Sequence, residues 1–198
     1  MTNKPFLQAL NGVAQTVPPI WMMRQAGRYL PEYRKLRTDA KDFLTFCYTP
    51  EMAAEATLQP ITRFGFDAAI IFSDILVIPD ALGQDVRFVP GEGPKLAALE
   101  NSAAIDALTP EAIEEFLAPV YAALRNVRAN LPAETALVGF AGAPWTLAAY
   151  MLEGSGSRDY ARARKFALAE PAAFQKLIGI LEDVIARHLI QQIEAGAE

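Results

Sequence analysis

The feature that most constrains this chain is a run of mostly apolar residues at 67–72 (DAAIIF) that shows no alternation with polar residues. A strand with one face in water alternates apolar and polar side chains, whereas a continuous apolar run is typical of a strand buried on both faces in a parallel sheet. Similar runs occupy residues 136–140 and, after two prolines, residues 20–23. We therefore expect three buried strands, at 20–23, 67–72 and 136–140.

Helix signals separate these strands. The Thr-Pro pair at 49–50 has the residue types favoured at an N-cap and a first helical position. We expect a helix from there to residue 64, kinked at Pro60 and ended by Gly65. A second Thr-Pro pair at 109–110 precedes apolar residues at helical spacing up to residue 127. Further helices are expected at 145–152, 158–168 and 171–195, and a strand at 86–89 is expected to form a small hairpin with a turn at 91–94.

The last of these helices is amphipathic. Apolar residues from Phe174 to Leu189 share one face with His188, so we expect His188 to be a buried structural side chain rather than a ligand.

The order of strands and helices predicts an α/β domain with a parallel sheet. A closed (β/α)8 TIM barrel needs eight strands and typically about 250 residues, and this chain has 198 residues. We therefore expect residues 1–198 to be the N-terminal part of a single barrel domain, incomplete at the C-terminus, or else a small open sheet. An unclosed barrel would expose two sheet edges and promote self-association.

Composition excludes several classes of protein. A net charge of −5 argues against general nucleic-acid binding. A single cysteine, Cys47, excludes a disulfide framework and cysteine-rich metal modules, and a single histidine excludes a multi-histidine metal site within this chain. We expect no signal peptide and no membrane span, because the uncharged stretch at 135–152 is interrupted by glycine and proline. These counts favour a reducing, cytoplasmic compartment.

The residues that could carry chemistry follow the expected strands, where the active sites of barrels are built. Arg24 and Arg28 flank Gln25, Ala26 and Gly27, and two guanidiniums at this spacing can converge on carboxylate or phosphate oxygens. The alternative is a pair of surface arginines that form ion pairs with acidic residues at 32 or 39.

Three further features have a functional and a structural interpretation. Asp74 directly follows the run at 67–72 and could accept hydrogen bonds from a ligand, or could cap a helix. The glycine-rich turn at 139–146 allows a ligand to approach the backbone and leads to the Tyr150 hydroxyl, but it could also be a plain turn. Phe43 could cover an apolar ligand or belong to the core.

Four segments resemble the uroporphyrinogen decarboxylase family, and they occur along the chain in the order that the family shows. The longest is PIWMMRQAGRYLPEYR at 19–34, and the second signature is GFAGAPWTLAAYM at 139–151. FSDIL at 72–76 and GEGP at 91–94 also fit, and the resemblance extends from about Leu7 to the last residue.

The resemblance implies a (β/α)8 barrel, a homodimer at full length and a cytoplasmic location. It implies decarboxylation of the four acetate side chains of uroporphyrinogen III to coproporphyrinogen III in haem and tetrapyrrole synthesis, with no metal or organic cofactor and with neither nucleic acid nor membrane as partner. The 198-residue chain alone is expected to be weakly active or inactive.

The resemblance also assigns roles to residues of this chain. Substrate binding falls to Arg24, Gln25, Ala26, Gly27, Arg28, Phe43, Asp74 and Tyr150, and catalysis to Asp74, Arg24 and Tyr150. In this assignment Asp74 binds the pyrrole N–H groups and Tyr150 lies near the reacting acetate, while the proton comes from Arg24 or Asp74.

Two alternatives remain open from the sequence. One is a methyltransferase of the same superfamily, whose zinc ligands would have to lie outside this segment. The other is a fragment that binds tetrapyrroles without converting them.

Overall fold

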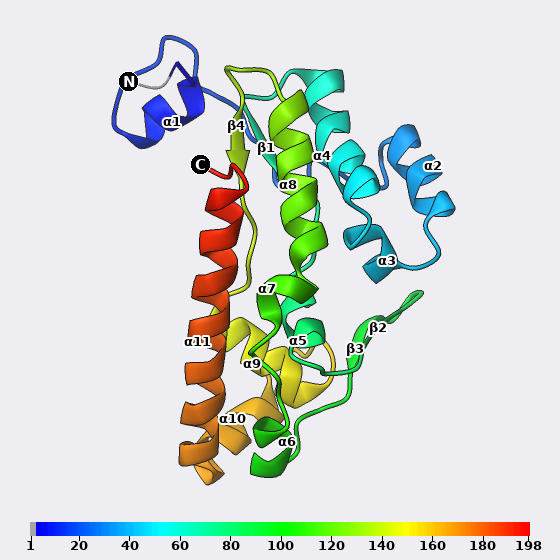
Figure 1. Cartoon of the computed structure of the whole chain (residues 1–198), viewed down its shortest axis with the longest axis vertical. Coiled ribbons are helices and arrows are strands. Elements are labelled where there is room, and N and C mark those ends of the chain that lie inside the picture. The colour runs from blue at the N-terminus through cyan, green and yellow to red at the C-terminus, as the bar shows by residue number, and fades with distance from the viewer. Residues whose placement is uncertain (1–2) are drawn as a thin grey trace. The chain divides into compact units, whose positions relative to one another are not determined.

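The computed structural model describes residues 3–198 as an α/β chain with two compact units (Figure 1). The first unit combines the residues up to Ser73 with Ala118–Phe140 and Gln191–Glu198. The second unit combines Asp74–Leu117 with Ala141–Ile190.

The centre of the first unit is a pair of parallel strands, β1 (Ala68–Ile70) and β4 (Ala136–Val138). Ala68 pairs with Ala136, and both residues are fully inaccessible to solvent. Burial on both faces explains why these strands have continuous apolar sequences. The strands predicted at 67–72 and 136–140 are confirmed, although the regular pairing is shorter than either run.

The third predicted strand is wrong, because residues 20–23 form no regular strand. The segment nevertheless lies beside the start of β1, where the Asp67 N–H donates to the Ile20 carbonyl over 2.9 Å. The Ile20 N–H donates to a carboxylate oxygen of Asp67 at 2.6 Å instead of to a backbone carbonyl. The Asp67 side chain thus takes the place of the backbone carbonyl that would accept from Ile20 in a regular strand pair. A turn at Met22–Gln25 ends the extended segment.

Helix α4 (Pro50–Phe64) behaves largely as its sequence predicts. Gly65 adopts the left-handed conformation with φ of 65° and donates to the Ile61 carbonyl at 2.8 Å, which ends the helix. The helix continues through Pro60. Thr49 occupies the N-cap position, but its hydroxyl donates to the Thr45 carbonyl and does not cap the helix.

Helices α4 and α8 (Ala118–Asn130) lie side by side in the first unit, and α2 (Pro31–Asp39) and α3 (Phe43–Cys47) also pack on α4 (Figure 1). Near the N-terminus, α1 (Pro5–Leu10) is a single short helix.

The helix predicted after Thr109 is divided in two. Regular structure begins with α7 (Ile113–Phe116), is interrupted at Leu117 and resumes in α8. Pro119 lies in the first turn of α8, where proline is tolerated, and it has no N–H to donate to a carbonyl four residues back in α7, so the two helices are not continuous. The Thr109 hydroxyl lies 3.3 Å from the Leu82 carbonyl and caps no helix.

The second unit contains the hairpin that the sequence predicts. Strands β2 (Val86–Val89) and β3 (Gly93–Leu96) pair antiparallel across the glycine-containing turn. Helices α9 (Pro144–Glu153) and α10 (Ala161–Ala169) pack on each other. The remaining short helices are α5 (Val77–Ala81) and α6 (Ser102–Asp106).

The longest helix, α11 (Pro171–Glu194), buries one face that includes Leu177, Leu181 and His188. Leu189 was expected on that face but is 42% exposed, because it lies about 100° around the helix from His188. After α11, Gly196 has φ of 110° and the Glu198 N–H donates to the Leu137 carbonyl at 2.8 Å. The chain therefore returns to β4 after the helix, as repeating βα units do.

None of the helices within residues 3–198 is long and apolar enough to cross a membrane. The uncharged stretch at 135–152 is divided between β4 and α9, as expected.

Candidate active site

The segment that contains Arg24 and Arg28 begins with a tight turn. The Gln25 N–H donates to the Met22 carbonyl at 3.1 Å, and Arg24 has φ of 59°. Among the common turns, a type II turn is the one with a positive φ at its third residue only. Glycine or asparagine is favoured at that third position. An arginine held in this conformation costs on the order of 1 kcal/mol or more, and such strain concentrates at functional sites.

Gln25 attaches this turn to the sheet. Its side chain is almost fully buried, its amide nitrogen donates to the Ala68 carbonyl at 3.0 Å, and its amide oxygen accepts from the Met22 N–H at 3.2 Å. The Tyr29 hydroxyl also donates to the Gln25 carbonyl. The Gln25 side chain therefore positions the turn on β1, a role that its place in the sequence did not suggest.

The two arginines beside Gln25 are exposed, and in the described chain neither forms an ion pair with a carboxylate. Glu32, the acidic partner considered from sequence, instead binds Arg63 at 3.0 Å. The interpretation of Arg24 and Arg28 as surface ion pairs is therefore wrong, and both guanidiniums are available to an anion.

A cavity of about 410 Å³ lies within the first unit beside this turn. Such a volume suits a small ligand or one arm of a larger one. The residues that line it come from the turn, from the end of β1 and the residues after it, and from the end of β4: Trp21, Met23, Arg24, Gln25, Ala26, Ile70, Ile71, Phe72, Ser73 and Phe140.

Phe43 lies one aromatic ring away from this cavity. Its ring meets Phe72 edge-on, with centroids 6.0 Å apart, and Phe72 lines the cavity. The Arg37 guanidinium carbon stands 5.8 Å from the centroid of the Phe43 ring. Phe43 is half-buried, and it flanks the cavity wall without being part of it.

Phe140, another lining residue, is held by a side chain that the sequence analysis did not identify. Gln192 is 1% exposed, and its amide oxygen accepts from the Phe140 N–H at 2.7 Å while its amide nitrogen donates to the Phe140 carbonyl at 3.0 Å. A Cβ on Gly139 would stand 2.7 Å from the same amide oxygen. The signal available in the sequence was the position of Gln192, four residues after His188 on the helix face that also carries the apolar side chains.

Asp74 belongs to the second unit. One carboxylate oxygen accepts from the Leu76 N–H at 2.9 Å, which is a local turn bond two residues along the chain. Helix α5 has Leu76 at its N-cap with no side-chain cap, so Asp74 is not the helix cap that the alternative interpretation proposed. Burial raises the pKa of Asp74, and the single backbone hydrogen bond opposes that shift only in part.

Tyr150 lies in the same unit as Asp74 and on α9. Burial raises the pKa of its phenol, and the charges of Tyr160 and Asp74 raise it further. The rings of Tyr150 and Tyr160 meet edge-on with centroids 6.5 Å apart. Tyr150 is thus near enough to Asp74 for the carboxylate to affect its ionisation.

His188, which was expected to be structural, is buried, and so is the single cysteine. His188 and Cys47 are each 1% exposed. Within residues 3–198 no group of three or more His, Cys, Asp and Glu side chains could hold a metal ion.

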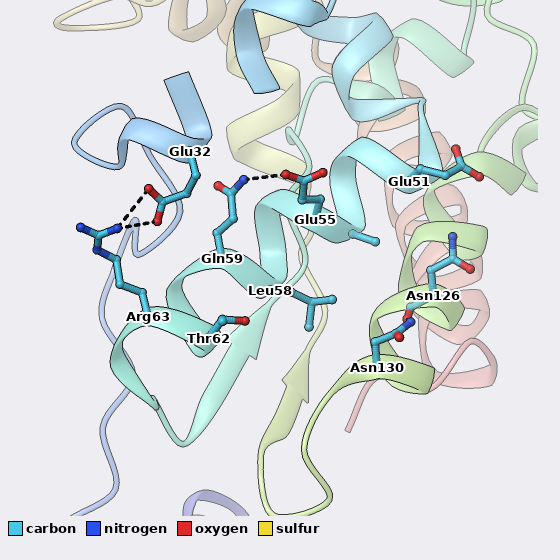
Figure 2. A pocket seen from close by; sticks show the side chains of 10 residues that line it. Glu32, Glu51, Glu55, Leu58, Gln59, Thr62, Arg63, Asn126 and Asn130 are labelled. Atoms are coloured by element: carbon cyan, nitrogen blue, oxygen red, sulfur yellow. Dashed lines mark hydrogen bonds and ion pairs between the residues drawn. The ribbon is translucent and has the colours of Figure 1, made fainter. Parts of the chain in front are cut away.

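A larger hollow of about 690 Å³ runs along α4 and contains none of the predicted site residues (Figure 2). The ion pair between Glu32 and Arg63 lies at one end, and Gln59 donates to Glu55 at 3.1 Å beside it. Its lining comes from the sides of helices rather than from strand ends, so we do not assign the predicted chemistry to it.

Parallel strands joined through helices, with candidate polar groups after the strand ends, are the arrangement of α/β proteins, the class that includes the (β/α)8 barrels. A solved structure of the same fold is a methyltransferase from Methanosarcina mazei, with a TM-score of 0.78 and 18% identity. The match covers 100% of this chain and 57% of that one.

Sequence comparison identifies the family. Residues 1–198 match the family model described as Uroporphyrinogen decarboxylase (URO-D). Proteins named uroporphyrinogen decarboxylase from Mesorhizobium japonicum and Paracoccus denitrificans are 58% and 55% identical over 196 and 199 residues. The matches cover 99% and 100% of this chain but 57% and 58% of those relatives. The chain belongs to the uroporphyrinogen decarboxylase family, and it spans a little over half the length of these relatives.

Proposed function

We propose that this chain supplies the N-terminal part of a single barrel domain that decarboxylates the four acetate side chains of uroporphyrinogen III to give coproporphyrinogen III. The observation that carries the proposal is Arg24, which lines a largely apolar cavity and forms no ion pair with a carboxylate within residues 3–198. A substrate with eight carboxylates on an apolar macrocycle needs that combination.

In this proposal the two arginines bind substrate carboxylates, since a guanidinium can donate two parallel hydrogen bonds to one carboxylate. The backbone of Ala26 and Gly27 lies against the substrate, and Phe43 backs the apolar wall. Gln25 contributes through the turn that it holds.

The chemical step replaces a carboxylate by a proton. A pyrrole protonated at its α-carbon is a cation that accepts the electron pair left when CO₂ departs, which turns the acetate arm into an exocyclic methylene. A proton delivered to this methylene carbon makes it a methyl group, and loss of the proton on the α-carbon restores the pyrrole, so the net change is one carboxylate replaced by one proton. Asp74 accepts hydrogen bonds from the pyrrole N–H groups and stabilises the cation. Tyr150 lies beside the reacting acetate.

Arg24 and Asp74 are the two candidates for the proton source, and a pH profile distinguishes them. Burial raises the pKa of the Asp74 carboxyl. A rate that falls as Asp74 ionises identifies Asp74 as the donor, and a rate that rises identifies it as the anion that stabilises the cation.

The proposal includes no metal or organic cofactor, a cytoplasmic location and a homodimer at the full length of the relatives. The resemblance to the family supports these three statements.

The test is an anaerobic product assay with uroporphyrinogen III on two proteins. One is this chain, and the other is a chimera in which the remaining length of the Paracoccus denitrificans relative follows residue 198. Products are oxidised and separated by carboxylate number. We expect porphyrins with seven to four carboxylates from the chimera and little or none from this chain alone. A folded chimera that gives no product would contradict the proposal.

A further inference from the structure

Arg24 occupies a strained position in the turn beside the cavity that it lines. Its backbone has φ of 59°, in the left-handed region that residues other than glycine rarely occupy. Strained conformations of this kind persist only where the surrounding structure fixes them. The contacts that hold the turn therefore determine whether Arg24 keeps its place at the cavity, and these contacts come from two sides.

Gln25 supplies the contacts on the first side. Its N–H donates to the Met22 carbonyl, its side-chain oxygen accepts from the Met22 N–H, and its side-chain nitrogen donates to the Ala68 carbonyl of β1. Gln25 is 2% exposed, so these bonds are shielded from water. They attach the start of the turn to the sheet.

Tyr29 supplies the contacts on the second side. Its hydroxyl donates to the Gln25 carbonyl, so the peptide unit that follows Gln25 is held as well. Its ring lies against the backbone of the turn, because a Cβ on Gly27 would stand 3.6 Å from the ring carbon Cδ1 and 3.5 Å from the Arg24 carbonyl oxygen. The Tyr29 ring and the Arg24 carbonyl thus lie near the same point of the chain.

The Tyr29 ring is itself supported by α4. It stacks on Phe64, the last residue of that helix, with ring centroids 6.4 Å apart and ring planes at 21°. Phe64 in turn contacts Phe66, with centroids 5.3 Å apart. The turn is therefore connected to the end of α4 through Tyr29 and to β1 through Gln25. Tyr29 does not line the cavity, so its effect on a ligand there must pass through the turn.

We propose that Tyr29 is a positioning residue that, together with Gln25, keeps Arg24 in the left-handed conformation in which it lines the cavity. Loss of the Tyr29 hydroxyl frees the Gln25 carbonyl, and Arg24 then relaxes towards negative φ. When the conformation that binds is only partly populated, the apparent affinity falls by the same fraction. The proposal rests on the proposed function for the identity of the ligand, and it adds Tyr29 to the residues on which binding depends.

Nuclear magnetic resonance of this chain tests the positioning without any ligand. At positive φ the amide and α protons of one residue lie close together, so Arg24 should give a strong intraresidue nuclear Overhauser effect. Tyr29→Phe removes the hydroxyl but keeps a ring to stack on Phe64, and it should weaken this effect. Tyr121→Phe is the control, because Tyr121 is a buried residue of α8 in the same unit and does not line the cavity. It should leave the Arg24 signal unchanged.

A double-mutant cycle tests the consequence for binding. Anaerobic calorimetry gives the affinity for uroporphyrinogen III of the wild-type chain, Tyr29→Phe, Arg24→Ala and the variant with both substitutions. Tyr29→Phe should weaken binding by about 2- to 10-fold when Arg24 is present, the range for one hydrogen bond. In the Arg24→Ala background, where Arg28 still binds the substrate, it should have no effect. Tyr121→Phe should bind as the wild-type chain does.

The outcomes separate this proposal from the proposed function. An unchanged Arg24 signal in Tyr29→Phe would overturn the positioning role, whether or not uroporphyrinogen binds. Equal weakening of binding by Tyr29→Phe with and without Arg24 would also overturn it, because Tyr29 would then act on the substrate independently of Arg24. A weakened Arg24 signal in a chain that does not bind uroporphyrinogen would support the positioning role and count against the proposed function.

Discussion

At the scale of single residues, the sequence indicated which side chains to examine but not how each is held. The pairing of Arg24 and Arg28 was visible in their spacing, and in the part of the chain that the structure describes neither arginine has a carboxylate partner. The role of Gln25 could not be predicted, because its partner at Ala68 is 43 residues away. Long-range bonds of this kind leave no local pattern in a sequence.

Asp74 gives a prediction at this scale. Burial raises its pKa above the ordinary value of 3.8, so the native state binds more protons than the unfolded state in the pH interval above 3.8. The stability of the wild-type chain therefore falls as pH rises through that interval. Asp74→Asn should be at least as stable as wild type at pH 7, with the difference vanishing below pH 3.8, as measured by urea unfolding.

The same substitution separates stability from activity. In the chimera, Asp74→Asn should lower kcat/KM by on the order of 10²-fold, as loss of an electrostatic group at a developing charge does. An Asp74→Asn chimera of normal activity would remove Asp74 from the mechanism.

At the scale of elements, strand and helix positions followed from apolar periodicity and from proline and glycine signals. The sequence failed where a single residue interrupts a pattern, as Pro119 does between α7 and α8, or where a side chain replaces a backbone partner, as Asp67 does beside Ile20. Neither the proline nor the side-chain hydrogen bond changes the spacing of apolar residues, so apolar periodicity alone could not reveal these two features.

The connection between α11 and β4 gives a second prediction. Gln192→Leu removes the amide that pairs with both backbone groups of Phe140. Leaving those buried groups unpaired should lower the free energy of unfolding by about 1–3 kcal/mol. Gln191→Leu is the control, because that side chain bonds only to Glu194 at the surface, and it should stay within about 0.5 kcal/mol of wild type. Equal effects of the two variants in urea unfolding would show that the bridge to Phe140 contributes nothing.

A third prediction concerns α7 and α11 in the second unit. Arg187 binds Glu114 through two bonds of 2.6 and 2.5 Å and lowers the pKa of that carboxyl. A lowered native pKa contributes stability above pH 4.5 that is lost as pH falls through the native value. Because both side chains are about a third exposed, screening limits the contribution to about 1 kcal/mol or less.

Glu114→Gln should therefore be less stable than wild type at pH 7 and equally stable near pH 3, as measured by urea unfolding at low salt. Glu100→Gln, which breaks the more exposed pair with Arg162 at 3.4 Å, should have no measurable effect. A loss in Glu114→Gln that is the same at both pH values would exclude the ion pair as its cause.

At the scale of the whole molecule, the parallel α/β architecture was predictable because buried strands and amphipathic helices alternate along the chain. The division into two compact units was not, since each unit combines segments far apart in sequence. The candidate residues are divided accordingly. Arg24, Arg28 and the cavity belong to the first unit, and Asp74 and Tyr150 belong to the second. Their order in the sequence indicated strand ends but gave no information on this division.

The most direct test of the account is anaerobic calorimetric titration of this chain with uroporphyrinogen III at two salt concentrations, because the central claim is that these 198 residues contain a binding site for a polycarboxylated tetrapyrrole. The account predicts saturable binding that weakens as salt rises, is displaced by coproporphyrinogen III and is lost in the double variant Arg24→Ala and Arg28→Ala. Binding that is absent, or that survives loss of both arginines, would contradict it.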